Sequence, residues 1–139
     1  MAPSTWATAE HGPEHVDLLE IYADADGETH FRKTTVDFQE RDFAPPSRPV
    51  RVSAEMPTGS SLFLVAPPGW DDDFHPTPRR QLAVLLDGTL TMTASDGETV
   101  TAEPGTAILL NDQDCKGHLT QVQGDRAATF LLVALPEAS

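Results

Sequence analysis

Short apolar runs alternate with turn residues along most of the chain, and this spacing is typical of a β-barrel or β-sandwich. Asp87-Gly88 and Asp96-Gly97 are turns of the kind that join antiparallel strands. Between them, residues 89–93 alternate polar and apolar side chains, as expected of a strand with one buried face. No apolar pattern of helical period continues for three turns, so the sequence predicts an all-β fold. The predicted strands are residues 16–22, 29–38, 50–56, 61–66, 81–86, 89–93, 98–102, 106–110, 118–122 and 127–135.

The pattern predicts one domain preceded by a tail. Residues 1–12 are polar and have no period, so we expect a flexible N-terminal tail, followed by a single β-barrel domain over residues 13–139. The strands at 16–22 and 29–38 are expected at the periphery, where open edges would favour a homodimer. The side chains expected to line the barrel interior are Phe63, Val65, Ala83, Leu85, Leu90, Met92, Ile108 and Leu110.

Composition narrows the range of partners. The 139 residues include 22 acidic and 9 basic side chains, for a formal net charge of -13. Such a surface repels nucleic acid and anionic membranes, so neither is an expected partner. No apolar run approaches the length of a membrane span, and the N-terminus does not resemble a signal peptide, which predicts a cytoplasmic protein. The single cysteine, Cys115, excludes an internal disulfide.

Candidate chemistry is concentrated in two histidines and a glutamine. His75 begins the run His-Pro-Thr-Pro-Arg-Arg-Gln that ends at Gln81, and His118 follows Lys116-Gly117. Gln81 and His118 each stand at the start of a predicted strand. Two imidazoles and an amide could therefore meet inside one small barrel.

These segments resemble the two linked motifs of the cupin superfamily, and in particular small single-domain bacterial cupins. The resemblance implies a jelly-roll barrel, also called a double-stranded β-helix. Two departures are evident, because the family pattern has a second histidine at Thr77 and a glutamate at Gln81. The metal motif is therefore degenerate. The residues that carry the resemblance are His75, Thr77, Gln81, Gly88, Gly105 and His118, with Val122 where the family has an asparagine.

The resemblance implies an enzyme acting on a small organic molecule inside the barrel, of dioxygenase, lyase or isomerase type, with bacterial secondary metabolism as one setting. His75, Gln81 and His118 would then hold a divalent metal such as Fe, Mn, Ni, Cu or Zn. Two alternatives stay open. One is a metal-free isomerase or cyclase in which His75 and His118 act as an acid-base pair. The other is a non-catalytic barrel that binds a small molecule.

Several neighbouring side chains could assist such a site. Arg79 shares the strand face of Gln81 and could clamp a substrate carboxylate, whereas Arg80 should point outward. Trp70 could close the pocket or pack on its rim. The three aspartates at 71–73 could favour imidazolium at His75, although a solvated loop is the commoner role. Cys115 could be a thiolate, but an incidental cysteine is the favoured interpretation.

Overall fold

The computed structural model describes residues 4–5, 14–70 and 73–137, and these ranges form strands, turns and loops without a helix. The all-β prediction is confirmed. Because no described segment is helical, none could cross a membrane as an apolar helix. The strands are β1 (Ser4–Thr5), β2 (His15–Ala23), β3 (Thr29–Asp37), β4 (Gln39–Arg41), β5 (Val50–Val52), β6 (Ser61–Ala66), β7 (Gln81–Asp87), β8 (Thr89–Ala94), β9 (Thr99–Ala102), β10 (Ala107–Asn111), β11 (His118–Gln123) and β12 (Ala128–Ala134).

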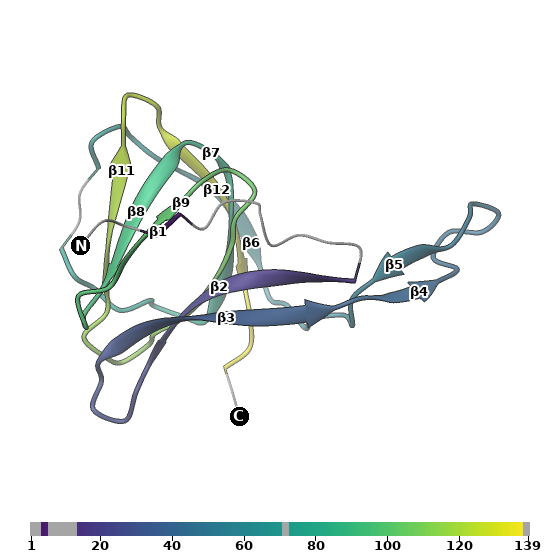
Figure 1. The fold of residues 1–139 in the computed structure, drawn as a ribbon, viewed down its shortest axis with the longest axis horizontal. Coiled ribbons are helices and arrows are strands. Elements are labelled where there is room, and N and C mark those ends of the chain that lie inside the picture. Colours follow the sequence, from purple (N-terminus) through teal and green to yellow (C-terminus); the bar gives the residue numbers. More distant parts are fainter. Residues whose placement is uncertain (1–3, 6–13, 71–72, 138–139) are drawn as a thin grey trace.

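Two sheets build the barrel (Figure 1). The larger sheet has the strand order β3-β2-β10-β7-β12-β6, and the smaller has the order β1-β9-β8-β11. Neighbouring strands are antiparallel except for β10 with β2 and β1 with β9. Strands far apart in sequence thus become neighbours, as in a jelly roll. Of the predicted tail, only Ser4–Thr5 are described, and they pair with β9.

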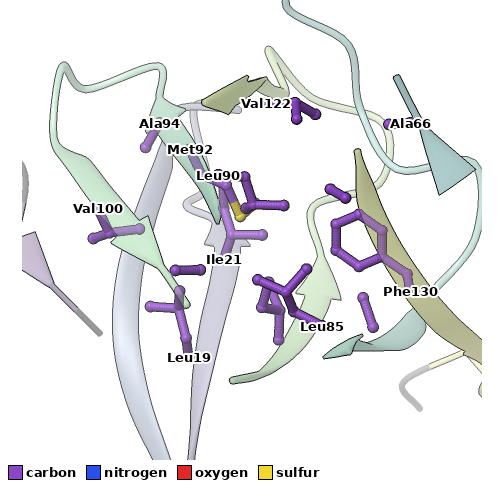
Figure 2. Packing of buried hydrophobic residues seen from close by; sticks show 14 residues of the cluster. Leu19, Ile21, Ala66, Leu85, Leu90, Met92, Ala94, Val100, Val122 and Phe130 are labelled. Atoms are coloured by element: carbon purple, nitrogen blue, oxygen red, sulfur yellow. The ribbon is translucent and has the colours of Figure 1, made fainter. Parts of the chain in front are cut away.

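The core lies between the two sheets and follows from strand alternation. In β8 the side chains of Leu90, Met92 and Ala94 are buried, whereas the threonines between them are half-buried on the other face. Leu85 and Phe130 project toward them from the larger sheet (Figure 2). A fully buried side chain of this size stabilises the fold by about 1.5–3 kcal/mol. Ala83, Leu85, Leu90, Met92 and Ile108 are buried as predicted, and Leu110 packs partly buried against this core.

The predicted position of β2 at the periphery is wrong. β3 pairs with one edge of β2 and β10 pairs with the other, so β2 is an interior strand. Its two acidic residues both have partners on β3. Glu20 is buried because Arg32 of β3 donates two hydrogen bonds to its carboxylate, and Asp17 accepts a hydrogen bond from Thr35. β3 is an edge strand, as predicted.

The predicted orientation of β6 is also wrong. Phe63 and Val65 are 72% and 62% exposed, whereas Leu64 and Ala66 face the barrel interior. Five apolar residues in succession give no alternation from which the inner face could be read. A shift of one residue reverses every side chain of a strand.

A long hairpin leaves the barrel between β3 and β6. β4 and β5 form a separate two-stranded sheet that projects away from the other strands (Figure 1). β4 was not predicted, and β5 ends at Val52 although a strand was expected over residues 50–56. The segment beyond this arm returns the chain to β6. In the connection from β6 to β7, the main chains of Trp70 and His75 bond to β11.

Candidate active site

A cavity of about 140 Å³ lies between the two sheets. Inner-face side chains of both sheets form its wall, together with residues of the connection between β6 and β7. The wall is mainly apolar, with a few polar groups, which is the usual composition of a site for a small organic ligand. Its lining residues are Leu64, Ala66, Trp70, His75, Gln81, Ala83, Leu90, Met92, Ile108, Leu110, His118, Thr120, Val122, Phe130 and Leu132.

Backbone hydrogen bonds bring the two histidines together. The amide of His75 donates to the carbonyl oxygen of His118, and the amide of His118 donates to that of His75, both at 3.0 Å. The two ring centroids are 5.0 Å apart. The structure therefore places both predicted histidines at the same end of the cavity, fixed to each other through the main chain.

Gly117 makes this close approach possible. The φ of Gly117 is +81°, a region that residues with a Cβ rarely adopt. A Cβ at position 117 would lie 2.2 Å from the carbonyl carbon and oxygen of His75. The glycine before His118 is thus required for the histidine pair.

Asp112 orients His118. Its side chain is fully buried, and one carboxylate oxygen accepts a hydrogen bond of 2.6 Å from Nδ1 of His118. The other oxygen accepts a hydrogen bond from the hydroxyl of Thr77. This contact fixes the tautomer of a neutral His118, since Nδ1 carries the proton and Nε2 keeps the lone pair. A carboxylate in this position also stabilises the positive charge that forms when Nε2 accepts a proton.

His75 is oriented in a related way by the main chain. Its Nδ1 lies 2.9 Å from the carbonyl oxygen of Asp73, which can only accept a hydrogen bond. Neutral His75 therefore also carries its proton on Nδ1. The two imidazoles differ in their surroundings, because His118 is buried against a carboxylate whereas His75 is more exposed.

Gln81 and Trp70 both line the cavity, as their predicted roles in ligand binding require. The carbonyl oxygen of Trp70 accepts a hydrogen bond from the amide of Val122, which fastens the connection between β6 and β7 to β11. Trp70 thereby closes one side of the cavity. Val122 also contributes to the cavity wall.

Arg79 does not line the cavity. It is exposed and borders an adjoining bowl that Gln81 also lines. Arg80 faces the outer side of the larger sheet, as alternation predicts, where Nη1 lies 3.4 Å from the carbonyl oxygen of Pro136. Its Nε is buried and makes no hydrogen bond within the described part of the chain.

Cys115 supports the turn before His118. Its thiol donates to the carbonyl oxygen of Asp112 at 3.0 Å, and its sulfur accepts a hydrogen bond from the amide of Gly117. Burial raises the pKa of the Cys115 thiol, which disfavours a thiolate ligand or nucleophile. Two of the three aspartates considered near His75, at positions 71 and 72, lie outside the described residues.

The side chains of this site do not match the usual cupin metal set of three imidazoles and one carboxylate. His75, Gln81 and His118 offer two imidazole nitrogens and a neutral amide oxygen, while Asp112 is engaged by His118 and Thr77. In residues 4–5, 14–70 and 73–137, no three His, Cys, Asp or Glu side chains form a group that could hold a metal ion. Thr77 is buried against Asp112 and does not line the cavity.

The strand order and the position of the histidines together give the architecture expected from the sequence. The two sheets form a jelly roll, the fold that the resemblance implies. No protein-family model and no curated protein sequence matches the chain. Several solved structures are similar to it. The Cnp3 cupin domain of Schizosaccharomyces pombe is 10% identical, with a TM-score of 0.45, over 92% of this chain and 88% of that domain.

The second similar structure is SPY1581, a conserved protein of unknown function from Streptococcus pyogenes, at 21% identity and a TM-score of 0.43, over 63% of this chain and 74% of that protein. The third is a Salmonella typhimurium protein assigned to ethanolamine utilisation, EutQ, at 18% identity and a TM-score of 0.37, over 88% of this chain and 97% of that protein.

Asp112 is the functional residue that the sequence pattern did not single out. It stands six residues before His118 in the turn after β10, where an acidic residue ordinarily suggests solvent exposure. Its burial depends on Thr77, which lies 35 positions away.

Proposed function

We propose that this barrel is an enzyme that binds a small, largely apolar organic molecule and moves protons on it with His118 and His75. The buried contact between Asp112 and His118 carries this proposal, because it prepares one imidazole to accept a proton at Nε2. His75, at a ring distance of 5.0 Å, is placed to return a proton. An isomerisation, elimination or cyclisation needs only such a pair.

The geometry supports a separate role for each residue of the site. His118 acts as the base, since the carboxylate of Asp112 stabilises its charged form. Asp112 is a positioning residue because it touches His118 and not the ligand. Gln81 offers an amide that can donate to or accept from a polar group of the ligand, and the apolar wall excludes water from the reacting atoms.

Proton exchange on a simple ketone tests the proposal without knowledge of the natural substrate. Phenylacetone, whose aromatic ring suits the cavity, would be incubated with the protein in D2O, and loss of its α-proton signal would be followed by NMR. We expect the protein to accelerate exchange, His118→Gln to abolish the acceleration, and the chelator EDTA to leave it unchanged. Binding of phenylacetone without exchange would instead identify a non-catalytic binding barrel.

A divalent transition metal held by His75, Gln81 and His118 is the second candidate. One observation favours it, since both histidines use Nδ1 for hydrogen bonds, and histidine ligands commonly use that pattern to present Nε2 to a metal. Titration of the apo-protein with Zn²⁺, Ni²⁺ and Fe²⁺, with His118→Gln as the control, tests it. Retention of exchange activity after EDTA, with no measurable metal binding, would contradict it.

The remaining expectations stay predictions. A homodimer would now pair through β3 or β6, which are the edges of the larger sheet. A cytoplasmic location and the absence of nucleic-acid and membrane partners rest on sequence and on the net charge of -13.

A further inference from the structure

An open bowl continues the cavity toward the solvent. Leu64, Gln81 and Leu132 line both spaces. Along β6 the inner-face positions run from Ala66 and Leu64 in the cavity to Leu62 in the bowl, and β12 makes the same progression. Since side chains two positions apart share a strand face, the bowl and the cavity are successive parts of one inner surface. The exposure of Leu62 and Leu64, 55% and 39%, marks its open end.

Arg79 supplies positive charge at this bowl. It borders the bowl together with Ser60 and Ser61, whose hydroxyl groups are polar neighbours. Arg32, Arg51 and Arg126 each form an ion pair with an acidic side chain, whereas Arg79 forms none within the described part of the chain. Arg41, Arg48 and Arg80 likewise form no ion pair there, but Arg79 is the arginine that borders the bowl. Arg79 thus offers a guanidinium whose geometry suits a carboxylate.

We propose that the ligand is a small organic acid whose apolar body occupies the cavity and whose carboxylate meets Arg79 in the bowl. This inference rests on the proposed function of the cavity. The cavity has a volume of about 140 Å³, close to that of an apolar cavity of about 150 Å³ that binds benzene. One aromatic ring therefore fills it. A net charge of -13 otherwise repels an anion, which makes a local cation at the entrance decisive.

A pair of matched ligands tests this assignment. 3-Phenylpropionate and 3-phenylpropan-1-ol share a ring and a chain, and differ in the charge of the end group. Binding would be measured by ligand-observed NMR or calorimetry. We expect the wild-type protein to bind the acid about threefold more tightly than the alcohol, the size of an exposed ion pair, and we expect salt to reduce this preference.

Two arginine variants separate a local effect from a general one. Arg79→Gln should remove the preference for the acid and leave binding of the alcohol unchanged. Arg48→Gln, which removes the same charge from the exposed arm, should preserve the preference. Ala83→Leu, which fills the cavity, should weaken binding of both ligands.

The possible failures are distinguishable. If the alcohol binds inside the cavity but the acid gains nothing, or if Arg79→Gln and Arg48→Gln reduce the preference equally, the role of Arg79 is wrong and the cavity site stands. If neither compound binds, or if Ala83→Leu has no effect on either, both the cavity site and the role of Arg79 are overturned.

Discussion

His118 and His30 are each bonded to aspartate, but the two clusters are built differently. His118 is buried, and one ring nitrogen contacts the single carboxylate of Asp112. His30, in β3, is partly exposed, and its Nδ1 and Nε2 contact Asp96 and Asp24 at 2.7 and 2.8 Å. One imidazole is thus held through one nitrogen, whereas the other is held through both.

This difference indicates a structural role for His30, whereas the proposed function gives His118 a chemical role. Both nitrogens of His30 must carry protons in order to donate to two carboxylates, so its imidazolium form is the one that the cluster stabilises. The hydrogen bond to Asp24, followed by that to Asp96, raises the pKa of His30. His30 joins the turn after β2 to the turn after β8 and has no nitrogen left for a ligand. The proposed function, in contrast, uses Nε2 of His118 for proton transfer.

The largest effect is expected from a substitution that breaks the His75–His118 cluster and leaves the His30 cluster intact. Gly117→Ala would force a Cβ against the main chain of His75, so the connection between β6 and β7 must move away from β11. We expect a loss of roughly 3 kcal/mol or more in the free energy of unfolding, measured with urea, together with loss of proton exchange on phenylacetone.

Gly124→Ala is the matched control. Gly124 also has a positive φ, +73°, but a Cβ there would meet no atom within 4 Å. Backbone strain alone should cost about 1–2 kcal/mol, with exchange activity preserved. Equal destabilisation by the two variants would show that the contact between residues 117 and 75 has no special role.

A smaller effect is expected when the charge at the buried cluster is removed. Asp112→Asn keeps the shape of the side chain but replaces the carboxylate that accepts from His118 and Thr77. We expect the free energy of unfolding to fall by about 1–2 kcal/mol, because a hydrogen bond to a charged group is weakened. Nitrogen NMR of the His118 ring should also show loss of the single Nδ1-H tautomer.

Asp114→Asn is the control for that substitution. Asp114 is exposed in the same turn and has a positive φ of 52°, a conformation that asparagine tolerates. The free energy of unfolding of Asp114→Asn should stay within about 0.5 kcal/mol of the wild-type value. An unchanged His118 tautomer in Asp112→Asn would show that Asp112 does not orient the ring.

The sequence predicted most strands because turns and alternation are local properties. Asp87-Gly88 and Asp96-Gly97 bound β8 as expected, and β6 occupies residues 61–66. The inner face of β6 could not be read, since its apolar run lacks alternation. The interior position of β2 was hidden because Asp17 and Glu20 are buried by partners on β3, which only the fold brings close.

For the same reason, the sequence predicted some residues of the candidate site and missed others. Spacing was sufficient to place His75, Gln81 and His118 on one cavity. Asp112 and the contact of Thr77 with it depend on a long-range approach of two loops, and no local pattern encodes that approach. Arg79 precedes β7, and its position beside the bowl depends on where β6 ends.

The smallest expected effect concerns His30 and appears as a dependence of stability on pH. Because the pKa of His30 is raised in the folded protein, the stability it contributes is fully present below its ordinary pKa and is lost as pH rises through the raised value. The difference in melting temperature between the wild type and His30→Gln should therefore shrink as pH rises from about 6.5, the ordinary pKa of histidine, through the raised value. Asp96→Asn, which removes one of the two carboxylates, should shift this loss to lower pH. Parallel melting curves of wild type and His30→Gln across that range would show that the outer cluster does not hold His30 in its charged form, and the contrast with His118 would then rest on burial alone.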